Sequence, residues 1–535
     1  MSKKWKPGLR ISSRVLQFIG VSLFFLAIFI LLLSKALNAE INHDEHQFVA
    51  GGKLLADQFS FPYIDYPFHH MPNLVLIYAL LFKLTNYCLL GARLLSVACA
   101  TLSAGILFYI TYQHFYYQGS LIRNLLAVAC VILLITNPLF ESVSGKAWNH
   151  DLPTLLILLS FAFLCRYDNQ DISTRKVFFS GILLGLAIGS RLSYATVIIP
   201  YIGAFLIFPS QQPRTSRYLH IIAFSIGVSL GLLPSFVLFI ANPKFFIFGN
   251  IIYPKLNPVY RNLLLHRSGM TIAGKIIYFL TNVISSPLNM LLYLGLFVIM
   301  ITAIVKSMLT KTSTNLSLVF VFGLSLFLLI GSFGPTPSWY QYYYAPIPFL
   351  ILGIFFGFST LFGKRRQLSW FLIIVPLLPV IIFSSARIVS FDDIKLMNHP
   401  NQLLTIQVHN FGMDIKSLLG EGKILTLAPI VPLEGGLDIY EAFATGPFTW
   451  RTAFLLSEEK REEYGVISHL DLDGYLENNP PDAILVGFES KNDGFGFGDL
   501  GGLEKPLTRF AIQHGYEAFT LSTEIVSDEI VLWVR

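Results

Sequence analysis

Long apolar runs separated by short polar segments fill the first 386 residues of the chain. The first run covers residues 15–33, close to the roughly 20 apolar residues that an α-helix needs to cross the hydrocarbon of a membrane. Because no small-residue cleavage site follows this run, we expect a retained helix and not a signal peptide. The whole pattern predicts about eleven membrane-spanning helices.

We tested the apolar runs against the rule that Lys and Arg stay on the cytoplasmic side of a membrane. The run over residues 177–208 is too long for one span, and we divide it into two helices at Arg191. The segment 73–88 is short and contains Lys83, which predicts a helix along the outer membrane surface. The predicted spans are residues 15–34, 89–112, 125–138, 152–165, the two parts of 177–208, 219–241, a helix ending at Lys306, a helix starting at Leu316, a helix ending before Lys364, and 368–385.

The basic residues also predict the orientation of the chain. With the N-terminal residues Lys3, Lys4 and Lys6 in the cytoplasm, every strong basic cluster lies inside. The loops that contain acids, histidines and aromatic residues then lie outside, at residues 36–88, 140–152, 242–287 and 334–344. The sequence therefore predicts a multi-pass protein of a plasma or inner membrane with its N-terminus in the cytoplasm.

The composition changes after Arg387. Residues 387–535 are polar, and short strand-like segments (423–427, 483–486 and 525–534) alternate there with helical patterns (456–464 and 507–514). Such alternation is typical of a small α/β domain. By the number of spans, this domain is extracytoplasmic, and residues 1–386 form a transmembrane domain.

Composition supports a polytopic membrane protein. Hydrophobic residues make up 54% of the 535 residues and charged residues only 13%, against about a quarter in soluble domains. The net charge of +6 follows the membrane rule loop by loop, so we expect membrane lipids and no nucleic acid as partners. Apolar stretches contain all the cysteines, which argues against disulfides and Cys-based metal sites: Cys88, Cys99, Cys130 and Cys165.

Two adjacent acids, Asp44 and Glu45, stand just after the first predicted span. One interpretation is a helix cap, since Asp is a favoured capping residue. The second outer loop favours chemistry instead, because Asp151 follows His150 there, just before the next span. Carboxylates over the same membrane face form a candidate pair in which one deprotonates an acceptor and the other orients it or binds a cation. Asp44, Glu45 and Asp151 are thus candidate catalytic residues.

Histidines also gather in the predicted outer loops: His43, His46, His69, His70, His150 and His266. Because His and carboxylate together suit Zn or Mn, a divalent metal is one interpretation. No tight ligand spacing such as HExxH occurs, which favours histidines that only form hydrogen bonds. We name His70 and His150 as candidate substrate-binding residues and leave the metal open.

Arg191 carries a charge inside an apolar stretch, where charges usually face a cavity or a partner. Its forked guanidinium suits a phosphate, although a snorkelling arginine at a helix end is the alternative. Arg93, at the start of the second predicted span, either shares this task or anchors the helix. Tyr343 and Tyr344 belong to a tyrosine run that is typical of the membrane interface and is also able to bind a phosphate.

Taken in order, these segments resemble the polytopic glycosyltransferases of the GT-C fold, in particular the family 39 protein O-mannosyltransferases and the aminoarabinose transferases. The similarity covers about residues 15–363. It is carried by Asp44-Glu45, the helical segment 48–55, Pro62-Tyr63-Ile64-Asp65, His70-Met71-Pro72-Asn73-Leu74, Ala92-Arg93-Leu94-Leu95-Ser96, Asp151, the segment from Gly185 to Arg191, and the segment 342–348. Two positions depart from the family pattern. Arginine stands at 191 where lysine is usual, and His70 falls in an element that often reads Lys-Pro-Pro-Leu.

The resemblance implies a glycosyltransferase whose donor is a hexose or pentose linked to a polyprenyl phosphate. The acceptor would be a lipid, a glycan or a protein at the outer membrane face. Asp44 would be the general base, and Arg191 with Arg93 would stabilise the charge on the departing phosphate. The resemblance requires no cofactor, and it leaves a divalent metal open.

Two other functions also fit outer acids and an intramembrane arginine. A lipid or ion transporter or flippase would distribute charges on both sides of the midplane, whereas the polar clusters here lie on the outer face. An oligosaccharide polymerase or ligase acting on a polyprenyl diphosphate would place arginines in one large outer loop, where only Arg261 and Arg267 occur. The sequence therefore favours the glycosyltransferase.

Overall fold

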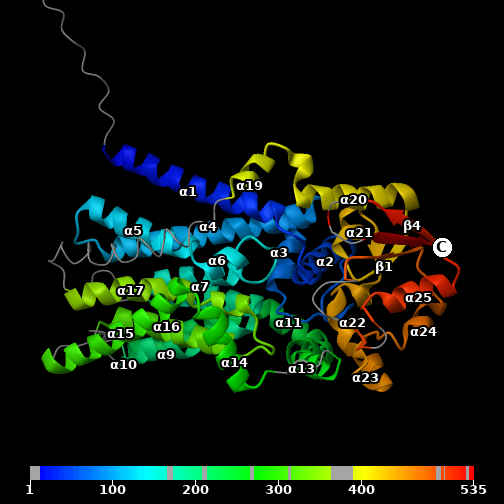
Figure 1. The fold of residues 1–535 in the computed structure, drawn as a ribbon. Helices are drawn as coiled ribbons and strands as arrows, with labels where there is room; N and C mark the ends of the chain where they lie inside the picture. The colour runs from blue at the N-terminus through cyan, green and yellow to red at the C-terminus, as the bar shows by residue number, and fades with distance from the viewer. Residues whose placement is uncertain are drawn as a thin grey trace, which may run out of the picture.

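A bundle of apolar helices forms one part of the molecule, and a smaller part with a β-sheet packs against one end of it (Figure 1). The computed structural model describes residues 13–165, 173–207, 214–264, 270–310, 315–362, 390–489, 496–498, 501–523, 525 and 529–535. Several predicted features lie outside these described residues: the last span (368–385), the N-terminal lysines, Lys364, His266 and Arg267.

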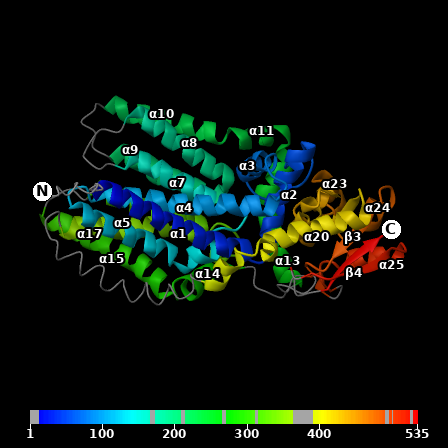
Figure 2. The same ribbon diagram turned by 90° about the horizontal axis from the view of Figure 1, so that it is seen from above.

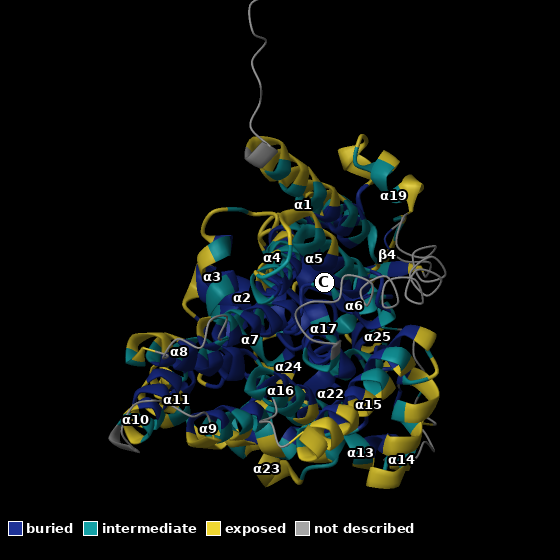
Figure 3. Ribbon diagram, turned by 90° about the vertical axis from the view of Figure 1, so that its left-hand side faces the viewer, coloured by how far each residue is buried: buried dark blue, intermediate teal, exposed yellow. Residues whose placement is uncertain are grey.

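The long helices of the bundle lie side by side and run roughly parallel (Figure 2). Their outward faces are exposed and carry large apolar side chains such as Phe18, Phe179 and Phe297, while their inward faces are buried (Figure 3). Exposed apolar surface of this extent is typical of helices that face lipid. The bundle contains α1 (Ser13–Asn38), α4 (Cys88–His114), α5 (Ser120–Ile135), α7 (Asp151–Leu164), α8 (Thr174–Ser190), α9 (Ile198–Ile207), α10 (Arg214–Gly231), α15 (Pro287–Thr310), α16 (Leu316–Ser332) and α17 (Ile347–Phe362).

Within the described residues, four helical segments are long and apolar enough to cross a membrane: Val15–Asn38, Cys88–His114, Pro287–Thr310 and Tyr340–Leu361. The pair Ser216–Gly231 and Leu233–Ala241, bent by 55°, would form a fifth span. Other apolar helices have 10–17 residues, so even the longest of them extends only about 25 Å at 1.5 Å per residue. The predicted number of about eleven spans therefore stays a prediction, whereas the multi-pass membrane protein is confirmed.

Short helices gather at the end of the bundle that faces the sheet-containing part (Figure 1). The helix that we predicted along the outer surface is α3, whose 10 residues reach only about halfway across a membrane core. The break at Arg191 is also as predicted, since α8 ends at Ser190 and a 3-10 turn, η1, follows. These elements are α2 (His43–Gln58), α3 (Asn73–Phe82), α6 (Pro138–Val143), η1 (Leu192–Val197), α11 (Leu233–Ala241), α12 (Pro243–Ile247), η2 (Phe248–Ile252), α13 (Tyr253–Leu264), α14 (Ile272–Tyr278), η3 (Phe279–Val283) and η4 (Tyr340–Tyr344).

The C-terminal part contains a five-stranded sheet with the order β2-β1-β3-β5-β4. Strand β1 is parallel to β2 and β3, while β5 is antiparallel to β3 and β4. Its elements are α19 (Phe391–Leu396), η5 (Pro400–Gln402), α20 (Leu404–Leu419), β1 (Lys423–Thr426), α21 (Ile430–Glu434), β2 (Asp438–Ile439), η6 (Glu441–Phe443), α22 (Pro447–Ala453), α23 (Glu458–Glu463), α24 (Leu472–Glu477), β3 (Ala483–Val486), α25 (Lys505–Gln513), β4 (Glu517–Leu521) and β5 (Ile530–Val534). The predicted alternation of strands and helices is therefore present.

The hydrophobic core is continuous between the bundle and the C-terminal part. Phe48 of α2 and Leu89 of α4 belong to the same cluster of buried side chains as Ile424 of β1 and Ile430 of α21. A polar contact reinforces this junction, because Glu434 accepts a hydrogen bond from the Leu89 backbone N–H at 2.6 Å. The C-terminal part is thus packed on the bundle by buried apolar area, which is the main stabilising contribution to such contacts.

Glycines allow α8 and α10 to pack with their backbones in close contact. A Cβ placed on Gly181 would lie 2.4 Å from the Phe224 carbonyl oxygen, and one on Gly185 would lie 2.3 Å from that of Val228. Small residues at helix interfaces permit this approach in membrane proteins. Because Arg191 follows α8 directly, the close crossing also fixes where Arg191 lies.

We expect Gly185→Ala to destabilise the protein, because a methyl group at this position overlaps backbone atoms that have no rotamer by which to move. Overpacking of this kind costs about 1–3 kcal/mol, and thermal unfolding of the detergent-solubilised protein measures it. Gly105→Ala in α4 is the matched control, since nothing lies within 4 Å of its added Cβ. Equal melting temperatures for the two variants would contradict the close crossing.

Candidate active site

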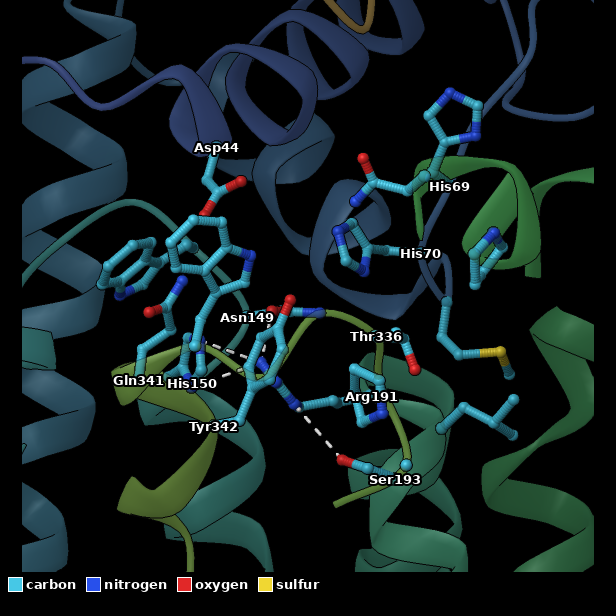
Figure 4. A pocket seen from close by; sticks show the side chains of 18 of the residues that line it. Asp44, His69, His70, Asn149, His150, Arg191, Ser193, Thr336, Gln341 and Tyr342 are labelled. Carbon is cyan, nitrogen blue, oxygen red and sulfur yellow. Dashed lines mark hydrogen bonds between the residues drawn. The ribbon is translucent and has the colours of Figure 1, made fainter. Parts of the chain in front are cut away.

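A cavity of about 1070 Å³ lies where the bundle meets the C-terminal part, and all four predicted outer loops contribute to its wall. Figure 4 shows how Asp44, His70, His150 and Arg191 point into it. The lining includes Asn42, His43, Asp44 and Phe48 from the start of α2, His69 and His70, Lys146, Trp148, Asn149 and His150, Arg191 and Ser193, Asn250, Tyr253 and Asn257, Trp339, Gln341 and Tyr342, and Phe448 and Arg451. The sequence-based grouping of these loops over one face therefore agrees with the structure.

The two adjacent acids at the start of α2 have different surroundings. Asn42 is the residue that caps the helix, since its side-chain oxygen accepts from the Asp44 backbone N–H at 2.9 Å, and Glu45 completes the capping box on the Asn42 N–H at 3.0 Å. The capping interpretation thus applies to Asn42 and Glu45. The Asp44 side chain lines the cavity, while Glu45 does not.

Glu45 forms a fully buried ion pair with Arg93 of α4. The two side chains meet through two hydrogen bonds of 2.9 Å and 2.7 Å, and both are 0% exposed. The remaining N–H groups of Arg93 donate to the carbonyl oxygens of Ala36, Ala39 and Glu40, so all five guanidinium donors are used. Arg93 is absent from the described lining of the cavity. Its hydrogen bonds tie the end of α1 to the start of α2.

The electrostatics of Glu45 reflect this pairing. Burial by itself would raise the pKa of Glu45, but the charge and hydrogen bonds of Arg93 act in the opposite direction. The backbone N–H of Ala147 donates to the same carboxylate at 2.7 Å, and the pKa of Glu45 falls below its ordinary value. The carboxylate is therefore ionised, and it connects the first outer loop to the second.

Arg191 lies in the cavity wall between α8 and η1. One terminal nitrogen of its guanidinium donates to the Asn149 side-chain oxygen at 3.1 Å and to His150 Nε2 at 2.9 Å, and its Nε donates to Ser193 Oγ at 3.3 Å (Figure 4). The centroid of the Tyr342 ring lies 4.9 Å from the guanidinium carbon of Arg191 in a cation–π contact. Within the part of the chain that the structure describes, no carboxylate forms an ion pair with Arg191, so its charge is directed at the cavity by neutral groups.

His70 and His150, two of the histidines in the cavity wall, are neutral. Burial, together with the charge of Arg191, lowers the pKa of His70 to about 3 and that of His150 well below its ordinary value. A neutral His150 is able to accept the hydrogen bond from Arg191. His70 stacks on Phe48 with ring centroids 5.1 Å apart, which fixes its ring in the cavity wall.

The other candidates lie behind this wall. Asp151 is 0% exposed and accepts hydrogen bonds from the Gly145 backbone N–H at 2.8 Å and from the Tyr344 hydroxyl at 3.1 Å. The Tyr343 hydroxyl donates to Ser338 Oγ at 3.2 Å. Of the tyrosine run it is Tyr342 that faces the cavity with Tyr340, whereas Tyr343, Tyr344 and Asp151 are absent from its described lining.

Some residues of the cavity were not chosen as candidates from the sequence. Tyr342 shares its run with the two tyrosines that we named, and only the 3-10 geometry of η4 decides which ring faces inward. His69 was noted among the outer histidines but was not chosen as a candidate. Arg451 lies in a polar segment of the C-terminal part, and no periodicity or motif there indicates a site. Groups of three or more His, Cys, Asp or Glu that could hold a metal ion do not occur among the described residues.

Comparison with known proteins identifies the fold. ArnT from Cupriavidus metallidurans, in a structure described as bound to undecaprenyl phosphate, aligns over 96% of this chain and 98% of its own with a TM-score of 0.60 at 13% identity. Residues 69–236 match the model of the family described as dolichyl-phosphate-mannose-protein mannosyltransferase. The chain has the GT-C fold. The resemblance inferred from the motifs is thereby confirmed.

Two further structures agree with this GT-C assignment. The apo state of the same ArnT has a TM-score of 0.56 at 13% identity, with 96% and 98% of the two chains covered. The Archaeoglobus fulgidus oligosaccharyltransferase, described as a complex with Zn and sulfate, has a TM-score of 0.50 at 12% identity, with 86% of this chain and 67% of its own covered. No curated protein sequence matches the chain.

We expect Arg93→Met to destabilise the GT-C bundle strongly, because Glu45 would remain buried without its partner. Breaking a buried ion pair on one side costs about 3–5 kcal/mol, which unfolding in detergent would measure. Lys395→Met is the control, since Lys395 and its partner Asp392 are 76% and 89% exposed. A stable Arg93→Met protein that only fails to bind lipid would show instead that Arg93 acts on substrate.

We expect the stability of the protein to fall in acid through its buried histidines. Burial lowers the pKa of His46 to about 3, so this ring stays neutral in the fold but binds a proton in the unfolded chain below its ordinary pKa of 6.5. The neutral His46 ring therefore makes its full contribution to stability above pH 6.5. As the pH falls from 6.5 toward 3, the free energy of unfolding decreases by about 1.4 kcal/mol per pH unit for the one proton that His46 binds in the unfolded chain. His46→Gln should make the decline between pH 6.5 and 4.5 less steep, while the exposed His399→Gln should not. Parallel profiles for His46→Gln and wild type would contradict a neutral His46.

Proposed function

We propose that this GT-C protein is a glycosyltransferase that moves a sugar from a polyprenyl-phosphate donor to an acceptor at the outer membrane face. The observation that carries the proposal is the pairing, in one cavity, of the Asp44 carboxylate with the Arg191 guanidinium. Asp44 is the one carboxylate among the described lining residues, and its charge reaches Arg191. A base and a fixed cation in the wall of one cavity suit transfer of a sugar from a phosphate leaving group.

Arg191 is the residue that we assign to the donor phosphate. A sugar phosphodiester carries one negative charge, and breaking the bond between the anomeric carbon and the phosphate oxygen adds a second charge to the departing group. A guanidinium that is already oriented by Asn149, His150 and Ser193 stabilises this developing charge without reorganisation. The structural neighbour ArnT, which is described as bound to undecaprenyl phosphate, supports a lipid phosphate as the ligand.

Asp44 is the residue that we assign to the acceptor. It removes the proton as the acceptor nucleophile attacks the anomeric carbon from the face opposite the phosphate, so the sugar is transferred with inversion. Asp44 is the second residue of α2, so it lies beside the helix N-terminus, which carries a partial positive charge. The sugar, hexose or pentose, and the class of acceptor (lipid, glycan or protein) are left open by these contacts.

The remaining candidates receive positioning roles in this proposal. The Glu45–Arg93 pair holds Asp44 at the start of α2, and Asp151 holds the second outer loop through Gly145 and η4 through Tyr344. The chain orientation also follows: the N-terminus is cytoplasmic and the C-terminal part is extracytoplasmic. This agrees with the lining of the cavity, which includes residues of α2 at the bundle end that adjoins the C-terminal part (Figure 2).

Transfer of labelled sugar from a polyprenyl-phosphate donor in membranes tests the proposal. We expect Asp44→Asn to lower the rate about 100-fold or more, since a positioned general base contributes roughly 10²–10⁴. Glu40→Gln is the matched control, because Glu40 is an exposed acid of the same loop that does not line the cavity. We expect Arg191→Gln to raise the donor concentration for half-maximal transfer about tenfold or more.

The outcomes separate the alternatives. Equal rates for Asp44→Asn and wild type would exclude Asp44 as the base. Absence of transfer from a broad panel of polyprenyl-phosphate sugars, together with movement of lipid or ions across proteoliposomes, would favour a transporter or flippase instead.

A further inference from the structure

Arg451 brings a second guanidinium into the cavity from the C-terminal part of the chain. It lies on α22, is only 4% exposed and donates to the Tyr253 hydroxyl of α13 at 3.3 Å. Its guanidinium also lies 4.7 Å from the Phe448 ring. Because 260 residues separate it from Arg191 in the sequence, only the packing of the C-terminal part on the bundle brings both into one cavity.

His69 forms the other side of this corner. Its ring stacks on Tyr253 with centroids 3.8 Å apart, and its Nε2 lies 2.6 Å from Thr449 Oγ1. His69 is 5% exposed, and its Nδ1 is buried without a hydrogen-bond partner among the described residues. A buried polar atom of this kind is destabilising unless a ligand or water completes its bonding. Figure 4 shows His69 on the far side of His70 from Arg191, and the charge of Arg451 acts on His69 whereas that of Arg191 acts on His70.

The charges of the cavity are unequal. Lys146, Arg191 and Arg451 face one carboxylate, Asp44, among the described lining residues. The charge of Asp44 reaches both guanidiniums. One donor phosphodiester supplies a single negative charge, whereas the described lining contains three basic side chains. A described lining with three basic side chains and one carboxylate favours anionic ligands, and it offers more than one cationic group to bind them.

We propose that Arg451, Tyr253 and His69 form a second anion-binding site, which holds a phosphate or carboxylate group of the acceptor while the donor phosphate lies on Arg191. The assignment to the acceptor rests on the proposed function. It follows from the location of Arg451 on the C-terminal part, away from the lipid-facing helices where a polyprenyl chain would lie. The fork of Arg451 and the hydroxyl of Tyr253 suit an oxyanion, and His69 adds a donor when Thr449 supplies the hydrogen bond to Nε2.

Titration with inorganic phosphate tests the second site without any need for turnover. The full chain in nanodiscs is first saturated with undecaprenyl phosphate, and its melting temperature is then followed as phosphate is added at constant ionic strength. We expect phosphate to raise the melting temperature further in wild type, in Arg451→Lys and in Arg509→Gln, an exposed control on α25. Arg451→Gln should lose this increase but keep the response to undecaprenyl phosphate.

Two other results of this titration would overturn the proposal. Phosphate that stabilises only when undecaprenyl phosphate is absent would place both anions on one site, and an unchanged phosphate response in Arg451→Gln would make Arg451 a structural residue. If Arg451→Gln fails to fold, Arg451→Lys and His69→Phe provide the same comparison, with a phosphate response reduced in His69→Phe.

The transfer assay assigns the anion to donor or acceptor. We expect Arg451→Gln to raise the acceptor concentration for half-maximal transfer about tenfold or more, and to leave that of the donor within about twofold. A selective change for the donor would overturn the assignment to the acceptor. If no sugar is transferred but phosphate still binds at Arg451, the proposed function fails while the second anion site stands.

Discussion

The buried ion pair between Glu45 and Arg93 is the interaction on which the geometry of the cavity depends. It joins the end of α1, the start of α2 and α4, and through the Ala147 N–H it also reaches the second outer loop. An ion pair without solvent contact is a poor source of net stability, since desolvation offsets most of its attraction. Its effect is instead to allow one arrangement of these segments, because any other leaves a charge buried alone. Asp44, one residue before Glu45, takes its position from that arrangement.

Around this fixed point, the cavity gathers residues whose charges are held apart by neutral groups. Arg191 is oriented by an amide, a neutral imidazole and a hydroxyl, none of which cancels its charge. Asp44 is likewise kept from forming an ion pair with it in the described structure. Preorganised but uncompensated charge of this kind is what electrostatic catalysis requires, because substrate and not protein completes the bonding.

The sequence predicted the architecture well because hydrocarbon and water impose strong patterns. Apolar runs, basic loops and the change after Arg387 identified the bundle, and the charge of Arg191 identified the break between α8 and η1. The two edge strands β2 and β4 were not predicted, since one has only two residues and the other is mostly exposed, with little apolar alternation.

Within the site, chemistry alone could not separate neighbours. Asp44 and Glu45 are adjacent acids, and the sequence does not show which of them faces a substrate. The structure distinguishes them, because Asp44 lines the cavity and Glu45 pairs with Arg93. The same holds for Tyr342 beside Tyr343 and Tyr344, since the turn that contains them sets the direction of each ring. Arg451 was beyond prediction for a different reason: its proximity to Arg191 is a product of tertiary packing over 260 residues.

The continuous core between α2, α4 and the sheet has a consequence for how the protein is made. Chain synthesis proceeds from the N-terminus, so the segments that contain Asp44 and Arg191 are made well before residues 423–534. Until then, Phe48 and Leu89 lack the core residues that the C-terminal part adds to their cluster, and α22 does not yet close the wall of the cavity. The last quarter of the chain therefore completes the site, because Asp44 and Arg191 lack the part of the cavity wall that Phe448 and Arg451 supply until that quarter has been made.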